Sequence, residues 1–251
     1  MIVSRGLTRR FGDLVAVDRL NLSVSSGEIY GFLGPNGAGK TTTIKMLTGV
    51  MKPSSGEIEI SGLNMDSAQM EIKRRIAVVP DEPRMYDNLK GNEFVRFIMD
   101  IYRLDKRQTS KRFEEIADTF GIDYLGKYIS DYSHGMKQKL MVAIALMREP
   151  EVIFLDEPTV GLDAASARKL KDWLKVMALD GATVFMTTHV LEVAEKMCDR
   201  IGIIDNGILI AEGSMDDLRA SSGKSEYSLE ELFLELTGNG QREEFSHNLG
   251  D

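Results

Sequence analysis

A chain of 251 residues is long enough for one large domain or two small ones. It carries 31 basic and 39 acidic residues, a net charge of −8, which gives no overall attraction to nucleic acid or to an anionic lipid surface. Cys198 is the only cysteine, which excludes an internal disulfide and is typical of a reducing cytosol. Residues 1–12 hold no apolar stretch of signal-peptide length, and the longest apolar run, 140–147, is too short to span a bilayer. We therefore expect a soluble protein, and any role at a membrane would need a separate membrane partner.

The N-terminal part of the chain predicts several strands and the start of one helix. Leu20, Leu22 and Val24 alternate with polar residues, which is the pattern of a half-buried strand in an antiparallel sheet. Further strands are expected at 29–33, 57–60 and 76–79, with a turn at 53–56 and a helix that begins within 42–47.

The middle of the chain predicts helices alone. No strand pattern lies between about residues 85 and 150, so we expect 86–149 to form an inserted helical segment. Two sets of apolar residues fall at helical spacing: Phe94, Phe97, Ile98, Ile101 and Tyr102, and then Phe113, Ile116, Ala117 and Phe120.

The last part of the chain returns to strands. Residues 152–155 are apolar on both faces, as central strands of a parallel sheet are. A helix at 164–179, a strand at 183–187 and a hairpin of 201–204 with 208–211 around Asn206-Gly207 are expected to follow. Ser228 and Glu231 form a capping box, so we expect a C-terminal helix within 221–236 and a polar, frayed tail at 237–251.

Residues 34–41 read Gly-Pro-Asn-Gly-Ala-Gly-Lys-Thr and fit the phosphate-binding P-loop pattern, with a strand before them and a helix after them. The alternative, a chance glycine-rich turn, does not explain that context. Glycines let backbone N–H groups surround a phosphate, and the helix N-terminus adds its positive end. Lys40 supplies a charge for the β- and γ-phosphates and Thr41 a hydroxyl for Mg²⁺. The residues predicted to bind nucleotide are Gly34, Pro35, Asn36, Gly37, Ala38, Gly39, Lys40, Thr41 and Thr42.

Two adjacent carboxylates, Asp156 and Glu157, close the apolar strand at 152–155. In a P-loop protein the first carboxylate at such a strand end serves Mg²⁺, and a second one can orient or deprotonate an attacking water. Acidic residues that simply end a strand are the alternative. His189 follows the next predicted strand, which places it at the same edge of the sheet, where ligands bind in open α/β folds.

Residues 133–138, Ser-His-Gly-Met-Lys-Gln, stand just before a predicted helix, and with them the chain resembles the nucleotide-binding subunit of an ABC transporter. The resemblance covers nearly all of residues 1–236, with the motifs in the family's order. It implies that 34–41 is the Walker A loop, 152–157 the Walker B strand with its catalytic Glu157, 161–163 the D-loop and His189 the switch histidine. Phe11 stands where the family has an aromatic that stacks on adenine, although a core aromatic would explain Phe11 equally well.

The resemblance is imperfect at two positions. The family signature reads Leu-Ser-Gly-Gly-Gln, whereas residues 132–136 read Tyr-Ser-His-Gly-Met, which keeps Ser133 and Gly135. His134 either points away from the phosphate or, when protonated, adds charge there and makes activity depend on pH. Asp81 stands where the family has a glutamine that contacts Mg²⁺ or its water, and it either keeps that role or is an ordinary loop residue.

For the fold, the resemblance implies an α/β protein with a single ABC ATPase domain. Residues 1–85 and 150–220 would form a P-loop NTPase core with a mixed central sheet and an antiparallel β subdomain. Residues 86–149 would form an α-helical subdomain that carries the signature.

For the chemistry, the resemblance implies two copies packed head to tail as a homodimer or a heterodimer. Each ATP would lie between the P-loop of one copy and the signature of the other, where Ser133 caps a helix whose N-terminus attracts the γ-phosphate. The implied catalytic residues are Lys40, Glu157 and His189, the implied Mg²⁺ residues are Thr41, Asp81 and Asp156, and Ser133, Gly135 and Asp163 would also bind the nucleotide.

The resemblance also implies a transmembrane permease subunit that docks around 81–91, in a groove that Met85, Tyr86, Leu89, Phe94 and Phe97 could line. We expect Phe94 and Phe97 to lie in the core of the helical segment instead. The protein would be cytoplasmic and peripheral on the inner face of the cell membrane, and the style of the sequence resembles the exporter branch.

Two other functions are weighed against the transporter subunit. A soluble ABC ATPase that acts on nucleic acid or ribosomes usually has two cassettes, coiled coils or basic extensions, none of which this acidic chain shows, so no nucleic acid is expected. The signature, His189 and the helical segment argue against a P-loop kinase or GTPase.

Overall fold

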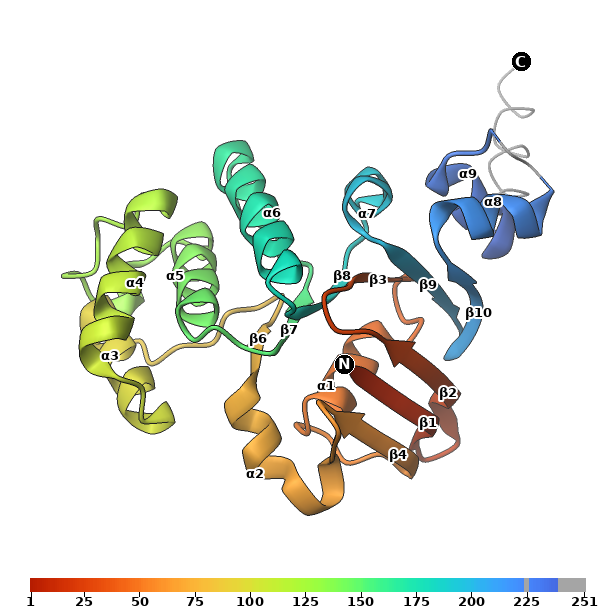
Figure 1. Ribbon diagram of the computed structural model, residues 1–251, viewed down its shortest axis with the longest axis horizontal. Helices are drawn as coiled ribbons and strands as arrows, with labels where there is room; N and C mark the ends of the chain where they lie inside the picture. The colour runs from red at the N-terminus through yellow and green to blue at the C-terminus, as the bar shows by residue number, and fades with distance from the viewer. Residues whose placement is uncertain (224–225, 239–251) are drawn as a thin grey trace.

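Two β-sheets form the framework of the protein, as Figure 1 shows for this computed structural model, which describes residues 1–223 and 226–238. The smaller sheet is antiparallel, in the order β2 (Leu14–Val24), β1 (Ile2–Phe11), β4 (Ser55–Ile60) and β5 (Leu63–Asn64). The larger sheet has the order β10 (Ile208–Gly213), β9 (Arg200–Asp205), β3 (Ile29–Leu33), β8 (Thr183–Thr187), β7 (Val152–Asp156) and β6 (Ile76–Val79). Only β10 is antiparallel in it, so the expected α/β fold with a mixed central sheet and an antiparallel sheet is confirmed.

The central strands β3, β7 and β8 are buried along their whole length, which explains why their sequences are mostly apolar. Their register brings the carboxyl ends together. Thr187 at the end of β8 pairs with Phe32 on one side and with Asp156 on the other, and Val79 at the end of β6 pairs with Leu155. The residues that follow these strands therefore meet at one edge of the sheet.

The helices α1 to α7 connect the strands or lie between them, and α8 and α9 follow β10. Their bounds are α1 (Lys40–Leu47), α2 (Met65–Arg75), α3 (Gly91–Tyr102), α4 (Lys106–Phe120), α5 (His134–Met147), α6 (Ala164–Leu179), α7 (Leu191–Met197), α8 (Met215–Ser222) and α9 (Leu229–Leu236). In Figure 1, α3, α4 and α5 form a lobe on one side of α6, and α8 and α9 lie at the opposite end. The prediction that the middle of the chain is helical is confirmed. Among the described residues, no helix is long and apolar enough to cross a membrane.

Three apolar clusters hold these elements together. The first joins the α3–α5 lobe and α6 to one face of the large sheet, through residues such as Phe120, Leu155 and Met186. The second packs α1 and the small sheet against the other face, around Phe154 and Phe185. The third joins α7, α8 and α9 to β3 and β9.

The capping box expected at Ser228 and Glu231 is present and begins α9. The expected start of that helix at residue 221 is wrong, because 221–222 are the last residues of α8, which Gly223 ends with a φ of +71°. The long strand β1 and the helix α2 were not predicted. Irregular pairing of β1 interrupts its alternation of apolar and polar residues, so the sequence shows no strand pattern there. The helix α2 buries only Met65 and Ile72, which is too few apolar residues to mark a helical face in the sequence. Of the expected tail at 237–251, residues 239–251 lie outside the described residues.

Candidate nucleotide-binding site

The glycine-rich loop joins β3 to α1 as predicted. Gly39, the N-cap of α1, has a φ of +109°, and its missing side chain leaves room for the carbonyl of Ala16, which a Cβ would approach to 2.6 Å. At Gly34 a Cβ would collide with the backbone oxygen of Ile204. Both positions therefore require glycine, and the loop is held against β2 and β9 with its backbone N–H groups at the start of a helix.

A cavity of about 240 Å³ lies in front of this loop and collects most of the predicted site residues. It is lined by Ala16, Asn36, Gly37, Gly39, Lys40, Thr41, Thr42, Asp81, Asp156 and Glu157. Lys40 Nζ donates to the carbonyls of Gly34 and Pro35, at 2.6 and 3.1 Å. Burial lowers the pKa of Lys40, while the nearby carboxylates of Glu157 and Asp156 raise it. A cationic ammonium is thus placed inside a loop suited to phosphate.

Two oxygen atoms suited to Mg²⁺ lie side by side in the wall of this cavity. Thr41 Oγ1 donates to Asp156 Oδ2 at 3.0 Å, and the Asp156 side chain is buried. Within 1–223 and 226–238, no group of three or more His, Cys, Asp and Glu residues is placed to hold a metal by itself. The oxygens of Thr41 and Asp156 fit Mg²⁺, which is usually held by one or two protein oxygens together with substrate phosphates and water. Asp81, an exposed residue, borders the same cavity.

Glu157 and His189 form a direct pair at the edge of the cavity. Glu157 Oε2 accepts from the backbone N–H of His189 at 3.1 Å and lies 2.8 Å from His189 Nδ1. Glu157 has a φ of +49°, a left-handed conformation that is uncommon for a side-chain-bearing residue and is found at functional sites. The Glu157 side chain is 15% exposed, so it reaches the cavity while the histidine holds one of its oxygens.

Thr187, which the sequence reasoning did not single out, organises both carboxylate residues. Its buried Oγ1 donates to Asp156 Oδ1 at 2.6 Å and accepts from the backbone N–H of Glu157 at 3.2 Å. The only signal in the sequence is a pair of hydroxyl residues, Thr187 and Thr188, which follow the apolar centre of a strand and stand just before His189.

The signature segment lies apart from this cavity within the chain. Ser133 is the N-cap of α5 and accepts from the backbone N–H of Met136 at 3.2 Å. A Cβ at Gly135 would come within 2.5 Å of the Gly161 carbonyl, and the exposed ring of His134 lies against Gly161. The histidine side chain therefore faces the loop at 161–163 of its own chain.

Asp163 is the N-cap of α6, where it accepts from the backbone N–H of Ser166 at 2.8 Å and pairs with Lys139 Nζ at 2.6 Å. The hydrogen bond from Lys139, followed by those from Ser166, holds the pKa of Asp163 well below its usual range. The loop at 161–163 is thus tied to α5 through this ion pair.

Phe11 ends β1 and is 43% exposed as a residue, and the guanidinium of Arg9 lies 4.6 Å from its ring centroid. It does not line the cavity, and neither do Ser133, Gly135 or Asp163. A single chain therefore assembles the P-loop, Asp81, Asp156 and Glu157 around one space and leaves the remaining predicted nucleotide contacts outside it.

Residues 17–160 match the family model described as ABC transporter, which is more than half of the chain. The chain belongs to the ABC transporter family. Among its ABC relatives, the probable multidrug ABC transporter ATP-binding protein YbhF of Escherichia coli is 36% identical over 249 residues, which are 97% of this chain and 43% of YbhF. The bacitracin transport ATP-binding protein BcrA of Bacillus licheniformis is 38% identical over 226 residues, 89% of this chain and 73% of BcrA. The chain thus spans less than half of YbhF but most of BcrA.

Solved ABC structures share the fold. One, described as the structure of an ATP binding subunit of an ABC transporter, has a TM-score of 0.91 and 32% identity and covers 94% of this chain and 99% of that chain. A second is a dimeric structure of a post-hydrolysis state of the ATP-binding cassette MJ0796 bound to ADP and Pi, with a TM-score of 0.78 and 26% identity. That match covers 86% of this chain and 99% of that chain.

Proposed function

We propose that this protein binds and hydrolyses ATP to power an ABC membrane transporter. The observation that carries the proposal is that Lys40, Thr41, Asp156 and Glu157 line one cavity in front of the P-loop. These groups supply a phosphate cradle, a pair of Mg²⁺ ligands and a candidate base, which are the parts that phosphoryl transfer to water needs.

In this mechanism Lys40 and the backbone N–H groups of the P-loop hold the β- and γ-phosphates in place. Thr41 and Asp156 would hold Mg²⁺, which neutralises phosphate charge when bound. Glu157 accepts a proton from the attacking water or orients it, and His189 keeps Glu157 Oε2 in position through the 2.8 Å contact. Asp81, on the border of the cavity, is the residue that senses the metal or its water.

A second copy of the nucleotide-binding subunit completes the site. Ser133 and Gly135 lie at the N-terminus of α5 and outside the cavity of their own chain, which is where a phosphate site offered to a partner would be. Phe11 would stack on adenine, and Asp163 would contact the shared nucleotide. A homodimer is sufficient, because one chain carries both kinds of half-site, and a heterodimer would also serve. Loss of the γ-phosphate removes the bridge between the copies, so the dimer loosens after hydrolysis.

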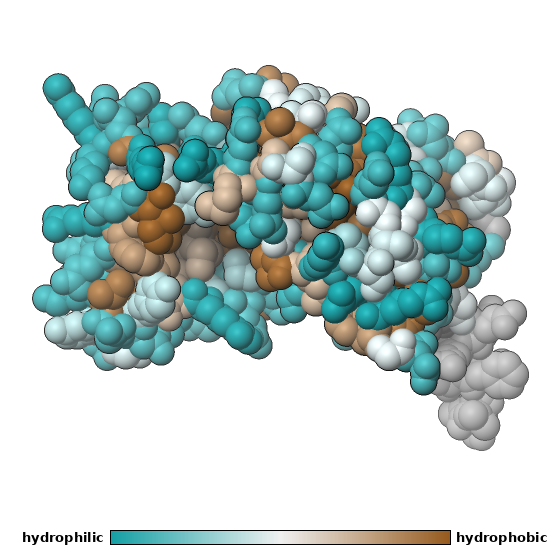
Figure 2. Space-filling model, turned by 90° about the horizontal axis from the view of Figure 1, so that it is seen from below, coloured by the Kyte–Doolittle hydropathy of each residue, from teal (hydrophilic) through white to brown (hydrophobic). Residues whose placement is uncertain are grey.

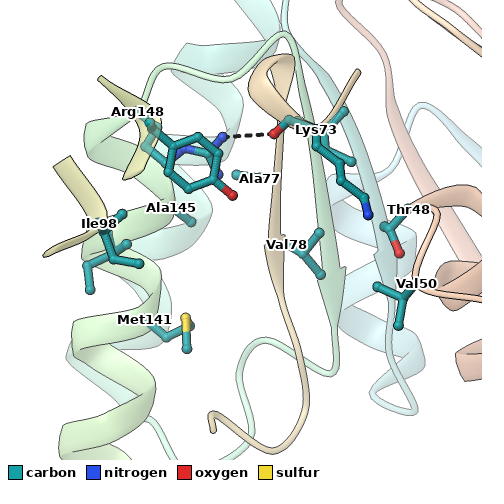
Figure 3. A pocket seen from close by; sticks show the side chains of 12 residues that line it. Thr48, Val50, Lys73, Ala77, Val78, Ile98, Met141, Ala145 and Arg148 are labelled. Atoms are coloured by element: carbon teal, nitrogen blue, oxygen red, sulfur yellow. Dashed lines mark hydrogen bonds between the residues drawn. The ribbon is translucent and has the colours of Figure 1, made fainter. Parts of the chain in front are cut away.

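A transmembrane permease subunit would dock in a groove between the core and the α3–α5 lobe. Figure 2 shows this face hollowed between the two parts, with apolar residues along the hollow. One section is a cavity of about 230 Å³, shown in Figure 3, where Val50 and Val78 of the core face Ile98 and Met141 of the lobe. At one end Arg148 donates to the Lys73 carbonyl at 3.2 Å and so ties α5 to α2.

The adjoining section of the groove, about 570 Å³, shares Val50, Val78 and Met141 with the first and runs to Asp81 and Asp156. Those two carboxylates also border the nucleotide cavity. Asp81 therefore lies where the docking groove and the nucleotide cavity meet, which supports a sensing role toward both.

The side chains first expected to line this groove lie elsewhere. None of Met85, Tyr86, Leu89, Phe94 and Phe97 lines either section. Phe94 is buried as expected, but the expectation for Phe97 is wrong, because it is 37% exposed and contacts Tyr86 edge-on.

The names of two relatives support the proposed direction of transport. YbhF is named a probable multidrug transporter protein and BcrA a bacitracin transport protein, which favours the export of drug-like or antibiotic substrates. The subunit would sit in the cytoplasm, peripheral on the inner face of the cell membrane.

The proposal is tested by Glu157→Gln, which keeps the shape of the side chain but removes the base. ATP turnover should fall on the order of 10² to 10⁴-fold, and the variant should elute as an ATP-bound dimer in size-exclusion chromatography. Glu149→Gln, at an exposed carboxylate paired with Arg112, is the matched control and should turn over normally. Unchanged turnover in Glu157→Gln would refute the catalytic assignment.

Docking is tested by Val50→Glu, which puts a charge into the groove at a side chain that is 71% exposed. It should abolish stoichiometric co-purification of a membrane-spanning subunit from native membranes. Leu179→Glu, at a side chain 88% exposed at the end of α6, is the control. Equal recovery of the membrane subunit with both variants would count against this groove.

A further inference from the structure

The residues that follow His189 form α7, which contacts α8 and α9. The N–H groups of Val193 and Ala194 bond to the carbonyl of Val190, so α7 starts its first turn one residue after His189. The histidine that contacts Glu157 is therefore separated from α7 by Val190 alone.

Glu195, in the second half of α7, is bound by both C-terminal helices. Its Oε1 accepts from Arg219 of α8 at 3.0 Å, and its Oε2 accepts from the backbone N–H of Leu229, the first residue of α9, at 3.3 Å. Arg219 also donates through Nε to the Tyr227 carbonyl at 2.8 Å, just before α9. One carboxylate thus joins three elements, and it satisfies an N–H group at the start of α9 that has no partner within the helix.

Apolar packing supports the same junction. Ala194 is fully buried beside Leu218, Leu229 and Leu232, and the cluster also contains Leu33, the residue before Gly34 of the P-loop. The P-loop strand β3 is fixed independently by its ladders to β8 and β9. On α7, Val193 and Met197 pack into the first apolar cluster, whereas Ala194 and Glu195 contact α8 and α9.

We propose that Glu195 is a positioning residue, which ties α7 to α8 and α9 and so holds His189 against Glu157. The proposal rests on the proposed function, since it assumes that His189 and Glu157 act in ATP hydrolysis. It gives the C-terminal helices a part in turnover although they lie outside the nucleotide cavity.

The chain offers a matched control on the same helix. Glu192 pairs with Lys196 at 3.5 Å, and both side chains are about four-fifths exposed, at 81% and 77%. A Glu192→Ala variant therefore removes a carboxylate and an ion pair from α7 without touching the junction.

The experiment measures kcat and KM for ATP in Glu195→Ala, Glu195→Gln, Glu192→Ala and His189→Ala, and in the double variant His189→Ala with Glu195→Ala. We expect Glu195→Ala to lower kcat about tenfold with KM nearly unchanged, since small misplacements of a catalytic group cost up to about 10²-fold. The kcat of Glu195→Gln should lie between those of Glu195→Ala and the wild type, because glutamine keeps an oxygen for the Leu229 N–H. Glu192→Ala should match the wild type.

The double variant decides whether Glu195 acts through the histidine. If it does, Glu195→Ala adds nothing to His189→Ala, because coupled residues are not additive. The proposal would be overturned if the losses of kcat in the two single variants add up in the double variant. It would also be overturned if Glu195→Ala leaves kcat unchanged, or if it raises KM by as large a factor as it lowers kcat. Normal turnover in His189→Ala would instead overturn the role of His189 in the proposed function, and this inference with it.

Discussion

Replacing Thr187 with valine should destabilise the protein and impair the nucleotide site at once. Valine has nearly the same shape as threonine but lacks the hydroxyl. Thr187 Oγ1 is buried, donates to Asp156 Oδ1 at 2.6 Å and accepts from the Glu157 N–H at 3.2 Å. The variant therefore leaves one oxygen of a buried carboxylate without its donor.

The two lost hydrogen bonds are not equally costly. The Glu157 N–H keeps its bond to the Thr187 carbonyl at 3.2 Å, so its second acceptor matters little. Asp156 Oδ2 keeps the Thr41 hydroxyl, but Oδ1 loses a short, charge-assisted bond. Bonds of this kind contribute about 1.5–3 kcal/mol, so the free energy of unfolding should fall by about 2 kcal/mol.

Urea denaturation of the nucleotide-free protein at neutral pH measures this loss, with Thr187→Ser and Thr48→Val as controls. Serine restores the hydroxyl. Thr48 is buried too, but its Oγ1 donates to the Ile44 carbonyl within a helix at 2.8 Å, so its removal should cost less. The reasoning is refuted if Thr187→Val loses no more stability than Thr48→Val, or if Thr187→Ser is as unstable as the valine variant.

Three further outcomes are expected. Asp81→Ala should lower Mg²⁺-dependent ATP turnover, and a Mg²⁺ titration that matches the wild type would contradict the sensing role. His134→Gly should leave the pH–rate profile superimposable on that of the wild type between about pH 6 and 8, because the ring faces Gly161. Loss of an inflection in the variant would instead support a role for protonated His134 at the phosphate. Gly135→Ala should lower the melting temperature, because its Cβ would overlap the Gly161 carbonyl and overpacking costs about 1–3 kcal/mol. Gly126→Ala is the control and should leave the melting temperature unchanged, because the space around Gly126 is open.

The parts of the fold that were predicted correctly are those encoded in short stretches of sequence. The P-loop, the apolar strands β3, β7 and β8 and the Asn206-Gly207 hairpin each combine a local pattern with a local geometry. The strand β1 lacks such a pattern, because positive φ at Gly6 and shifts in its pairing break the alternation.

The contacts that organise the site were not predictable in the same way. Thr187 meets Asp156 only through the register of β7 with β8, and Glu195 meets Arg219 across two elements. Neither residue belongs to a motif, and each acquires its partner from tertiary packing. The reverse holds for Phe97, whose helical spacing suggested burial although its ring lies partly exposed beside Tyr86.

The apolar cluster of the α3–α5 lobe has a consequence for protein engineering. It continues without a break into β6, β7 and β8, through Val79, Leu155 and Met186. A fragment of residues 86–149 would therefore lack one wall of its own core. Grafting the lobe of one relative onto the sheet of another should succeed only when the facing strand residues are exchanged along with it.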